Sequence, residues 1–364
     1  MNDTGIYIHV PFCARKCGYC DFYSGKYSRE TSDGYVQAVI RNLKSFSAEE
    51  LSVSTVYFGG GTPSLLSSQQ LKLIMDEVRR SFHLLPDAEV TLEANPSTVN
   101  SEKLDGMLSA GITRLSLGVQ SMNDDELRFL GRNHTPERAA KAVRDADAAG
   151  FRNISCDLMI ALPGQTENKL LRSIQRLSEL PIQHISAYIL KVEEDTPFFH
   201  NGIGDILPDE DCTAKLYLVM VNAMEERGFM QYEVSNFAKD GFHSRHNCRY
   251  WKCEDYIGIG PSAHSCHGGK RYAAEADIRS FIDSPQQVTY VTDDSPCGFE
   301  EFAMLRLRLK EGLRLTDVQE HRCDIEKKLP QLMREGYVLF DGEKVSLTPK
   351  GFLMSNSVIE YLIF

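Results

Sequence analysis

The sequence predicts an α/β protein in which helices cover the outer face of a parallel sheet, followed by a small α+β domain. From residue 5 to about 240, short apolar or β-branched runs alternate with helical windows. Such alternation is typical of parallel strands joined by helices. After residue 298 the pattern changes to helices around one short hairpin. These two patterns define the expected fold class.

Six strand–helix units are expected in the first part of the chain. The strands are predicted at 6–10, 55–58, 90–93, 114–118, 154–159 and 185–190. The helices between them are predicted at 35–45, 67–81, 101–110, 137–149 and 167–180. Six such units fit a partial (β/α)6 barrel, and a doubly wound open sheet would give the same periodicity. A further helix is expected at 213–227, ended by Gly228.

The last part of the chain resembles a winged helix. Helices are predicted at 299–310, 315–320 and 325–335, then a hairpin of 337–340 and 344–347, then a helix from Pro349. Asp341-Gly342 is a strong hairpin-turn signal. Over 298–364 ten Lys and Arg face eleven Asp and Glu, so this segment lacks the basic surface of a DNA-binding domain. We therefore expect a barrel over 1–240, a connecting segment over 241–297 and a C-terminal domain over 298–364 that packs against the barrel.

Composition limits the classes of function. The 364 residues carry a net charge of −11, which disfavours nucleic acid and anionic lipid as non-specific partners. No apolar run reaches the ~18–20 residues of a membrane-spanning helix, and the polar start predicts no signal peptide. Ten cysteines at uneven spacing then indicate reduced thiols and metal ligation in the cytoplasm.

Three cysteines near the start of the chain carry the clearest chemical signal. Cys13, Cys17 and Cys20 follow the spacing Cys-x3-Cys-x2-Cys directly after the first predicted strand. Three thiolates on one loop can ligate three irons of a cubane cluster and leave the fourth iron open. Zinc sites usually need a fourth ligand, and none follows at zinc spacing. An odd number of cysteines in so short a loop also makes a disulfide arrangement a poor explanation.

This spacing, with Tyr19 before the last cysteine, resembles the signature of the radical S-adenosylmethionine superfamily. The flanking segments Tyr-Ile-His-Val-Pro-Phe-Cys and Tyr-Cys-Asp-Phe are similar to one branch, the HemN/HemW group. The resemblance implies a partial radical-SAM barrel that carries a 4Fe–4S cluster on Cys13, Cys17 and Cys20, together with S-adenosylmethionine.

Polar or flexible residues follow several predicted strands, at the sheet edge where parallel barrels gather functional groups. Gly59-Gly60-Gly61-Thr62 follows the second strand and allows a ligand to approach the backbone. Glu93 ends the third strand, where a buried carboxylate needs a partner. Further along come Gln120, Arg132 and Asp157, which suit hydroxyl and carboxylate groups. Taken singly, each is more often solvated surface than ligand.

Their order matches the S-adenosylmethionine contacts of HemN-like proteins. The resemblance implies cofactor contacts at Tyr7, Tyr19, Gly60, Gly61, Thr62, Glu93, Gln120, Arg132 and Asp157. The segment Ala161-Leu162-Pro163-Gly164-Gln165-Thr166 also matches the group, except that Ala161 replaces the usual Gly. That exchange concerns the backbone path and removes no ligand.

A second motif, His246-Asn247-Cys248-Arg249-Tyr250-Trp251, resembles the heme-chaperone branch, HemW. Neutral His is a common ligand of heme iron, and the aromatic pair Tyr250 and Trp251 offers a flat apolar wall. The alternative is a purely structural role, in which His246 caps a loop while the two aromatic rings fill the mouth of the barrel. Cys248, Cys253 and Cys266 lie close in sequence, with a spacing that fits free buried thiols better than a second metal site.

Two functions remain for a chain of this group. A heme chaperone would hold the cluster and S-adenosylmethionine, bind heme as cargo and pass it to acceptor proteins, which the resemblance implies are membrane-associated respiratory proteins. An oxygen-independent coproporphyrinogen III dehydrogenase would start oxidative decarboxylation with a radical. The dehydrogenases carry a fourth cysteine two residues after the third and a long N-terminal arm, whereas this chain has Phe22 there and Tyr7 near its start. We therefore expect the chaperone and assign no catalytic residue.

Overall fold

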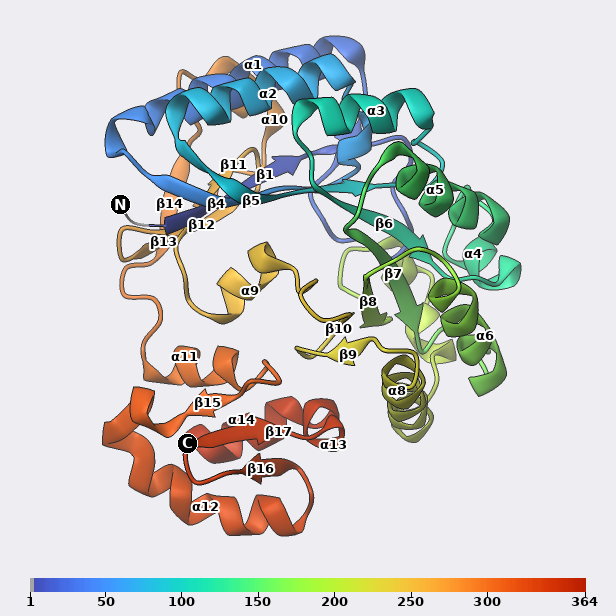
Figure 1. Ribbon diagram of the computed structural model, residues 1–364, viewed down its shortest axis with the longest axis vertical. Helices are drawn as coiled ribbons and strands as arrows, with labels where there is room; N and C mark the ends of the chain where they lie inside the picture. Colours follow the sequence, from blue (N-terminus) through green and yellow to red (C-terminus); the bar gives the residue numbers. More distant parts are fainter. Residues whose placement is uncertain (1–2) are drawn as a thin grey trace.

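The computed structural model describes residues 3–364, and a single curved sheet dominates it (Figure 1). The sheet has twelve strands in the order β14-β13-β12-β11-β1-β4-β5-β6-β7-β8-β10-β9. Its central strands are β1 (Asp3–Val10), β4 (Ser52–Gly60), β5 (His83–Ala94), β6 (Arg114–Gln120), β7 (Ile154–Ile160), β8 (His184–Ile189) and β11 (Tyr256–Ile259). All of these pair in parallel. The six predicted strands are thus present in the predicted sequential order, as an open arc.

The seventh parallel strand, β11, and the antiparallel strands at both edges of the sheet were not predicted from the sequence. Those edge strands are β9 (Met230–Gln231), β10 (Asn236–Ala238), β12 (His264–His267), β13 (Lys270–Ala274) and β14 (Thr289–Asp293). Strands β11 to β14 come from the part of the chain expected to be a connecting segment. That segment therefore extends the barrel sheet beside β1. A short separate pair, β2 (Phe12–Cys13) with β3 (Gly25–Lys26), flanks the cysteine loop.

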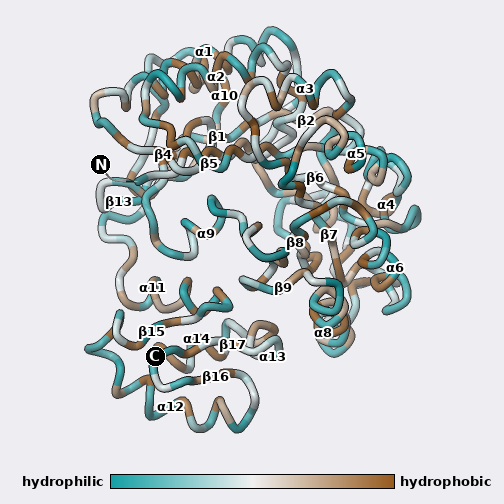
Figure 2. Tube along the Cα trace, in the orientation of Figure 1, coloured by the Kyte–Doolittle hydropathy of each residue, from teal (hydrophilic) through white to brown (hydrophobic). Residues whose placement is uncertain are grey.

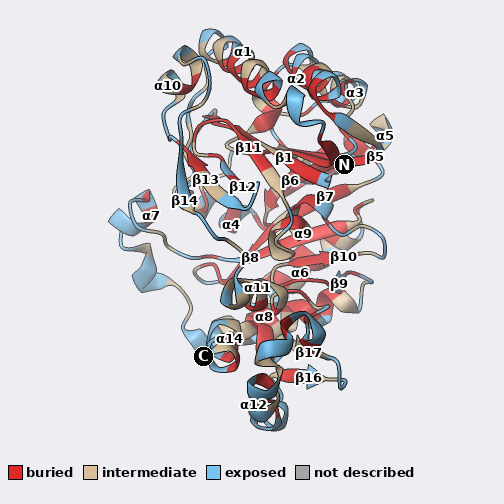
Figure 3. Ribbon diagram, turned by 90° about the vertical axis from the view of Figure 1, so that its left-hand side faces the viewer, coloured by how far each residue is buried: buried red, intermediate tan, exposed pale blue. Residues whose placement is uncertain are grey.

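Helices line the convex side of the sheet (Figure 1). They are α1 (Arg29–Ser45), α2 (Ser68–Ser81), α3 (Ser101–Ala110), α4 (Asp124–Phe129), α5 (Pro136–Ala149), α6 (Glu167–Ser178), α8 (Glu210–Glu225) and α10 (Ile278–Asp283). Figure 2 shows their hydrophobic residues interspersed with hydrophilic ones, and Figure 3 shows the strands between them largely buried. Local signals define the helix ends: Ser67 and Gln70 form a capping box at α2. The hydrophobic core lies between these helices and the strands.

The two faces of each central strand differ in polarity. On β1, Ile6, Ile8 and Val10 are buried in the helix-side core, whereas the alternate residue Tyr7 contacts aromatic rings on the concave side. Successive side chains of a strand point to opposite faces. The concave interior holds charged groups too, among them the fully enclosed Arg114. The barrel lumen is therefore polar, unlike the core outside it.

One helix enters that lumen from the concave side. Helix α9 (Arg245–Trp251) lies within the arc of the sheet, away from the outer helices (Figure 1). It contacts β4 and the first helix of the C-terminal domain. The residues predicted as a heme motif thus form a lumen helix.

The C-terminal domain has helices around a small sheet, close to the expected plan. Its elements are α11 (Phe299–Arg306), β15 (Leu313–Arg314), α12 (Arg322–Arg334), β16 (Val338–Phe340), β17 (Lys344–Leu347), α13 (Pro349–Leu353) and α14 (Ser355–Ile363). The sheet order is β15-β17-β16, antiparallel. A segment of 3-10 helix, Leu315–His321, stands where a helix was predicted over 315–320. Across residues 3–364, no helix combines the length and apolarity that crossing a bilayer requires.

Candidate functional site

A cavity of about 370 Å³ opens at the carboxyl ends of the parallel strands. It is lined by residues from five strands and the loops that follow them, and by the cysteine loop. The lining residues are Cys13, Arg15, Cys17, Tyr19, Cys20, Phe22, Gly60, Gly61, Thr62, Glu93, Ala94, Asn95, Ser116, Gly118, Gln120, Arg132, Asp157, Met159 and Tyr188. Of the predicted cluster and cofactor residues, only Tyr7 is absent from this lining. Residues far apart in sequence thus meet at the sheet edge where parallel barrels place their sites.

All three cysteines of the loop are free thiols on the wall of this cavity. The Thr62 hydroxyl contacts Cys13 Sγ at 3.7 Å, and Arg132 Nη1 contacts Cys17 Sγ at 3.5 Å. Burial raises the pKa of the Cys20 thiol. Arg132 lies where its positive charge could offset the negative charge of a ligated Cys17.

Within residues 3–364, no three or more His, Cys, Asp or Glu side chains form a group that could hold one metal ion. A cubane cluster differs from a single ion, because each thiolate binds a different iron and the sulfurs need not converge on one point. Three thiols of one loop that line a common cavity fit that donor set. The cluster on these cysteines accordingly stays a prediction supported by the donor set.

The glycines after β4 are required by the packing of the chain. Gly60 has φ +104, and a Cβ there would lie 2.6 Å from the His9 ring. A Cβ on Gly61 would lie 2.6 Å from the Phe12 carbonyl oxygen. The backbone of this turn therefore packs directly against β1 and the start of the cysteine loop. The glycines bring the turn beside the cluster loop, whatever ligand the cavity takes.

Glu93 is the most constrained carboxyl group of the cavity. The Tyr57 hydroxyl donates to Glu93 Oε1 at 2.7 Å, and the Gly60 N–H donates to Oε2 at 3.2 Å. Burial, together with the nearby carboxyl of Asp157, raises the pKa of Glu93 to about 7, against the opposing effect of these hydrogen bonds. Glu93 is therefore fixed in orientation and poised to become fully ionised when a cation binds.

Asp157 is the second buried carboxyl of the site. The Ser116 hydroxyl donates to Asp157 Oδ1 at 3.3 Å. Burial raises the pKa of Asp157 to about 6, while the guanidinium groups of Arg114 and Arg132 favour its ionised form. Two carboxyls with raised pKa values at one cavity are typical of a binding or catalytic site.

Gln120 reaches the cavity from the end of β6, and Arg132 reaches it from the loop after α4. Arg132 Nη2 donates to the Gly118 carbonyl at 2.6 Å, and its Nε is buried without a partner. Gln120 has φ +69, a left-handed conformation that non-glycine residues adopt at a cost. A Cβ on Gly118 would lie 3.1 Å from Gln120 Nε2. The glycine thus leaves room for both polar side chains.

Tyr7 lies deeper in the lumen. Its hydroxyl bonds to His9 Nδ1 at 3.1 Å, and its ring stacks on Tyr57 and His246 at centroid distances of 6.2 and 6.4 Å. Burial strongly raises the pKa of Tyr7. Tyr7 therefore packs behind the residues that line the cavity and is not itself part of the lining. Its predicted contact with the nucleotide has no counterpart in the cavity lining.

Several cavity residues escaped sequence analysis. Tyr188 follows the buried part of β8, and Met159 lies near the end of β7. Phe22, which the sequence did single out, is 59% exposed at the cavity. A polar aromatic residue near the end of a predicted barrel strand could have signalled Tyr188. Met159 gave no signal, because an apolar residue near a strand end usually packs in the core.

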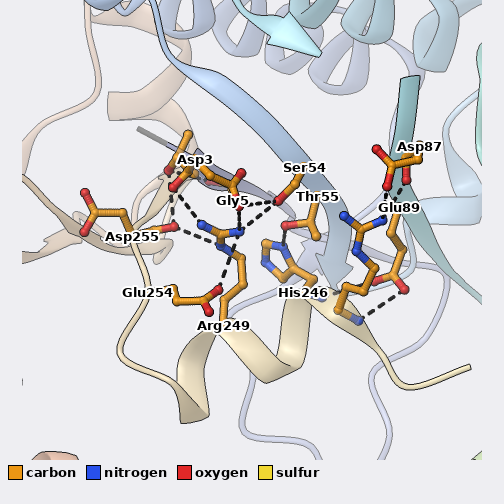
Figure 4. Close-up of polar contacts among 12 residues, drawn as sticks. Asp3, Gly5, Ser54, Thr55, Asp87, Glu89, His246, Arg249, Glu254 and Asp255 are labelled. Carbon is orange, nitrogen blue, oxygen red and sulfur yellow. Dashed lines mark hydrogen bonds and ion pairs between the residues drawn. The ribbon is translucent and has the colours of Figure 1, made fainter. Parts of the chain in front are cut away.

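His246 is enclosed in the lumen. Its Nδ1 pairs with Thr55 Oγ1 at 2.8 Å and its Nε2 with the Tyr250 hydroxyl at 2.8 Å. Its ring stacks on Tyr57 at 5.2 Å, and its backbone N–H donates to Glu89 at 3.1 Å. Burial lowers the pKa of His246 to about 3, so the ring is neutral. Figure 4 shows the ring pointing from α9 toward Thr55. Both ring nitrogens are engaged, which leaves neither for a metal ion in this structure.

Arginines hold α9 in place on either side of His246 (Figure 4). The buried Arg249 pairs with Asp3 Oδ2 at 2.9 Å and donates to Ser54 Oγ at 2.8 Å and to the Asp255 carbonyl at 3.0 Å. Arg245 pairs with Asp87 at 3.3 Å. The motif thus ties α9 to β1, β4 and β5. Cys266 is a buried thiol, whereas Cys248 and Cys253 are only half-buried.

Comparisons with known proteins match the whole chain. The family model described as Radical SAM superfamily matches residues 7–177, and the HemN C-terminal domain matches residues 299–354. A protein named heme chaperone HemW from Lactococcus lactis is 33% identical over 99% of this chain and 97% of its own length. Another of that name from Escherichia coli K12 is 34% identical over 100% and 99%. The mitochondrial radical S-adenosyl methionine domain-containing protein 1 of Bos taurus is 38% identical over 99% and 87%.

The fold also has a solved counterpart. The structure of the Escherichia coli coproporphyrinogen III oxidase HemN, described as a radical SAM enzyme, superposes with a TM-score of 0.82. It covers 100% of this chain and 90% of that chain at 20% sequence identity. At this identity the likeness establishes the fold, including the open arc of the barrel, and leaves activity undecided.

Proposed function

The chain belongs to the HemW family of radical SAM proteins, and we propose that it is a heme chaperone that binds heme and transfers it to acceptor proteins. The observation that carries this proposal is the identity of 33–34% to proteins named heme chaperone HemW, extending over nearly the full length of both chains. Such coverage includes the barrel, the α9 motif and the C-terminal domain together. Similarity of one domain alone would not separate the family's branches.

We assign the cluster to Cys13, Cys17 and Cys20. Their shared place on the wall of one cavity supports this assignment. A 4Fe–4S cluster bound there would supply an open iron for a chelating ligand and a source of single electrons. Arg132 would offset the negative charge of the ligated thiolates, because its guanidinium already contacts Cys17.

S-adenosylmethionine is the proposed ligand of the remaining cavity. The ordered carboxylate of Glu93 suits its cationic amino group, and the unpartnered Nε of Arg132 suits its carboxylate. Gln120 and Asp157 supply donors and acceptors for hydroxyl groups. Gly60, Gly61, Thr62 and Tyr19 line the same cavity. Tyr7 would act indirectly, because its ring stacks on Tyr57, whose hydroxyl donates a hydrogen bond to Glu93.

Heme contact by His246, Tyr250 and Trp251 stays a prediction. A ligating role for His246 requires that it give up its hydrogen bond to Thr55 or to Tyr250. The expected location of the protein follows from the heme acceptors that the family resemblance implies. We propose delivery from the cytoplasm to membrane-associated respiratory proteins.

The alternative function, coproporphyrinogen III dehydrogenase, has the fold likeness to HemN in its favour. Phe22 speaks against it. At the position where the dehydrogenases carry a fourth cysteine, this chain presents an apolar ring at the cavity. Incubation of reconstituted protein with coproporphyrinogen III, reductant and S-adenosylmethionine should give no protoporphyrinogen. Formation of that product at a catalytic rate would establish the dehydrogenase instead.

The chaperone activity is tested by loading reconstituted protein with heme and adding isolated membranes. Heme should leave the protein and appear in membrane proteins. Retention of all heme would contradict the proposal. A triple variant with Cys13, Cys17 and Cys20 replaced by Ala should lose the iron–sulfur absorbance, whereas replacing the exposed Cys212 and Cys323 should leave it unchanged.

A further inference from the structure

A second cavity lies on the other side of α9, between the barrel and the C-terminal domain. It measures about 440 Å³, within the usual range for small-molecule sites. It is lined by Glu225, Met230, Gln231, Tyr232, His243, Cys248, Lys252, Leu309, Lys310 and Glu311. Its walls come from α8, β9, α9 with its preceding loop, and the turn after α11. In Figure 1 these elements face the space between the two domains.

His243 is the residue that distinguishes this cavity chemically. Its exposed ring stacks on Tyr232 at a centroid distance of 4.2 Å and an interplanar angle of 13°. Within residues 3–364, neither of its ring nitrogens takes part in a hydrogen bond, in contrast to the fully engaged ring of His246. Its partial burial lowers its pKa, which favours the neutral imidazole that binds metal. The stack fixes the ring while leaving its nitrogens free.

The rest of the lining matches a flat apolar ligand with carboxylates. Tyr232, the exposed Met230 and the buried Leu309 offer apolar surface. Lys252 from the barrel and Lys310 from the C-terminal domain supply positive charge, and Glu225 and Glu311 also line the cavity. The buried Gln231 has a carbonyl oxygen without a hydrogen-bond partner. Cys248 adds a thiol, a second class of iron ligand.

We propose that this cleft is the heme site, with His243 as the ligand of the heme iron and Lys252 and Lys310 as partners of the propionates. This inference rests on the proposed function as a heme chaperone. It is an alternative to the predicted contact at the enclosed ring of His246 and places the heme at an open face of the same segment. A cleft between two domains also gives a bound heme a way out toward an acceptor.

The test is a heme titration of reconstituted protein followed in the Soret band. His243→Ala should weaken heme binding at least tenfold and change the Soret position, and added imidazole should restore the wild-type spectrum. His200→Ala removes another exposed histidine, on the helix Pro197–His200, and should have no effect. Lys252→Glu combined with Lys310→Glu should weaken binding without moving the Soret band, because charge partners do not ligate iron.

The outcomes separate the site from the function. If the wild type binds heme and His243→Ala binds it with unchanged affinity and spectrum, the cleft is not the site and the chaperone function stands. If the wild type does not bind heme, both proposals fail. Because His243 is exposed, the variant should fold. Retained iron–sulfur absorbance and circular dichroism verify this.

Discussion

Tyr57 controls the ionisation of Glu93, and its replacement by Phe should weaken S-adenosylmethionine binding at neutral pH. The hydroxyl donates a 2.7 Å hydrogen bond to the carboxylate, which stabilises the ionised form. A hydrogen bond to a charged group contributes roughly 1.5–3 kcal/mol. At about 1.4 kcal/mol per pKa unit, its loss should raise the pKa of Glu93 from about 7 to about 8 or 9.

At pH 7 the ionised fraction of Glu93 should then fall from about one half to about a tenth or less. A ligand held through its cationic amino group should bind about tenfold more weakly, and the deficit should narrow as pH rises toward 8.5. Isothermal titration of the reconstituted variant between pH 6 and 8.5 measures this dependence. Phe retains the ring stack on His246, so the lumen packing is preserved.

The matched control is Tyr35→Phe. Tyr35 also loses a 2.7 Å hydrogen bond, to the His9 carbonyl, and it does not contact Glu93. This control should bind S-adenosylmethionine as the wild type does. Equal affinity of Tyr57→Phe and wild type at pH 7 would refute the reasoning. A deficit of the same size at every pH would do so too, because it would indicate lost packing and not a shifted titration.

Three further outcomes are expected. Ala161→Gly should stabilise the protein by about 1 kcal/mol in thermal unfolding, because Ala161 has φ +58 and only glycine adopts that conformation without strain; a lower midpoint would contradict this. Arg249→Leu should lower stability by about 2 kcal/mol in urea, since it removes the ion pair with the half-exposed Asp3 and the hydrogen bonds that the buried guanidinium donates to Ser54 and to the Asp255 carbonyl. Glu93→Gln should remove a pH dependence. The folded carboxyl keeps its proton up to about pH 7 whereas the unfolded one ionises near 4.5, so this group lowers wild-type stability by about 3 kcal/mol between these values. The variant's stability should fall by about that much less, with the remaining decline due to Asp157 and Glu233.

Sequence patterns predicted the parts of the fold that depend on local signals. Helix α3 spans the predicted residues because Asn100 caps its start and Gly111 adopts a left-handed conformation at its end. The six central strands were visible as apolar runs. Ala161 stands at a left-handed position, which fits the glycine that the sequence resemblance implies there. In each case the deciding interaction lies within a few residues of the signal.

The missed features depend on distant partners. Strand β11 has four residues, one of them glycine, and it becomes a strand only by pairing with β1. The role of His246 was equally hidden. A polar helix usually faces water, and here it fills a lumen lined by polar groups such as Thr55 and Glu89. Hydrophobic periodicity cannot indicate burial where both surfaces in contact are polar.

The position of β1 in the middle of the sheet bears on how the protein matures. Gly5 pairs with Tyr256 on one side, while the other side of β1 pairs with β4. A strand made first is therefore completed by one made much later, and contacts of such sequence separation form slowly. During synthesis, the edge beside the cysteine loop stays unpaired until most of the chain has emerged from the ribosome. A nascent chain that stalls before β11 would therefore present the thiols of the cysteine loop beside an unprotected sheet edge.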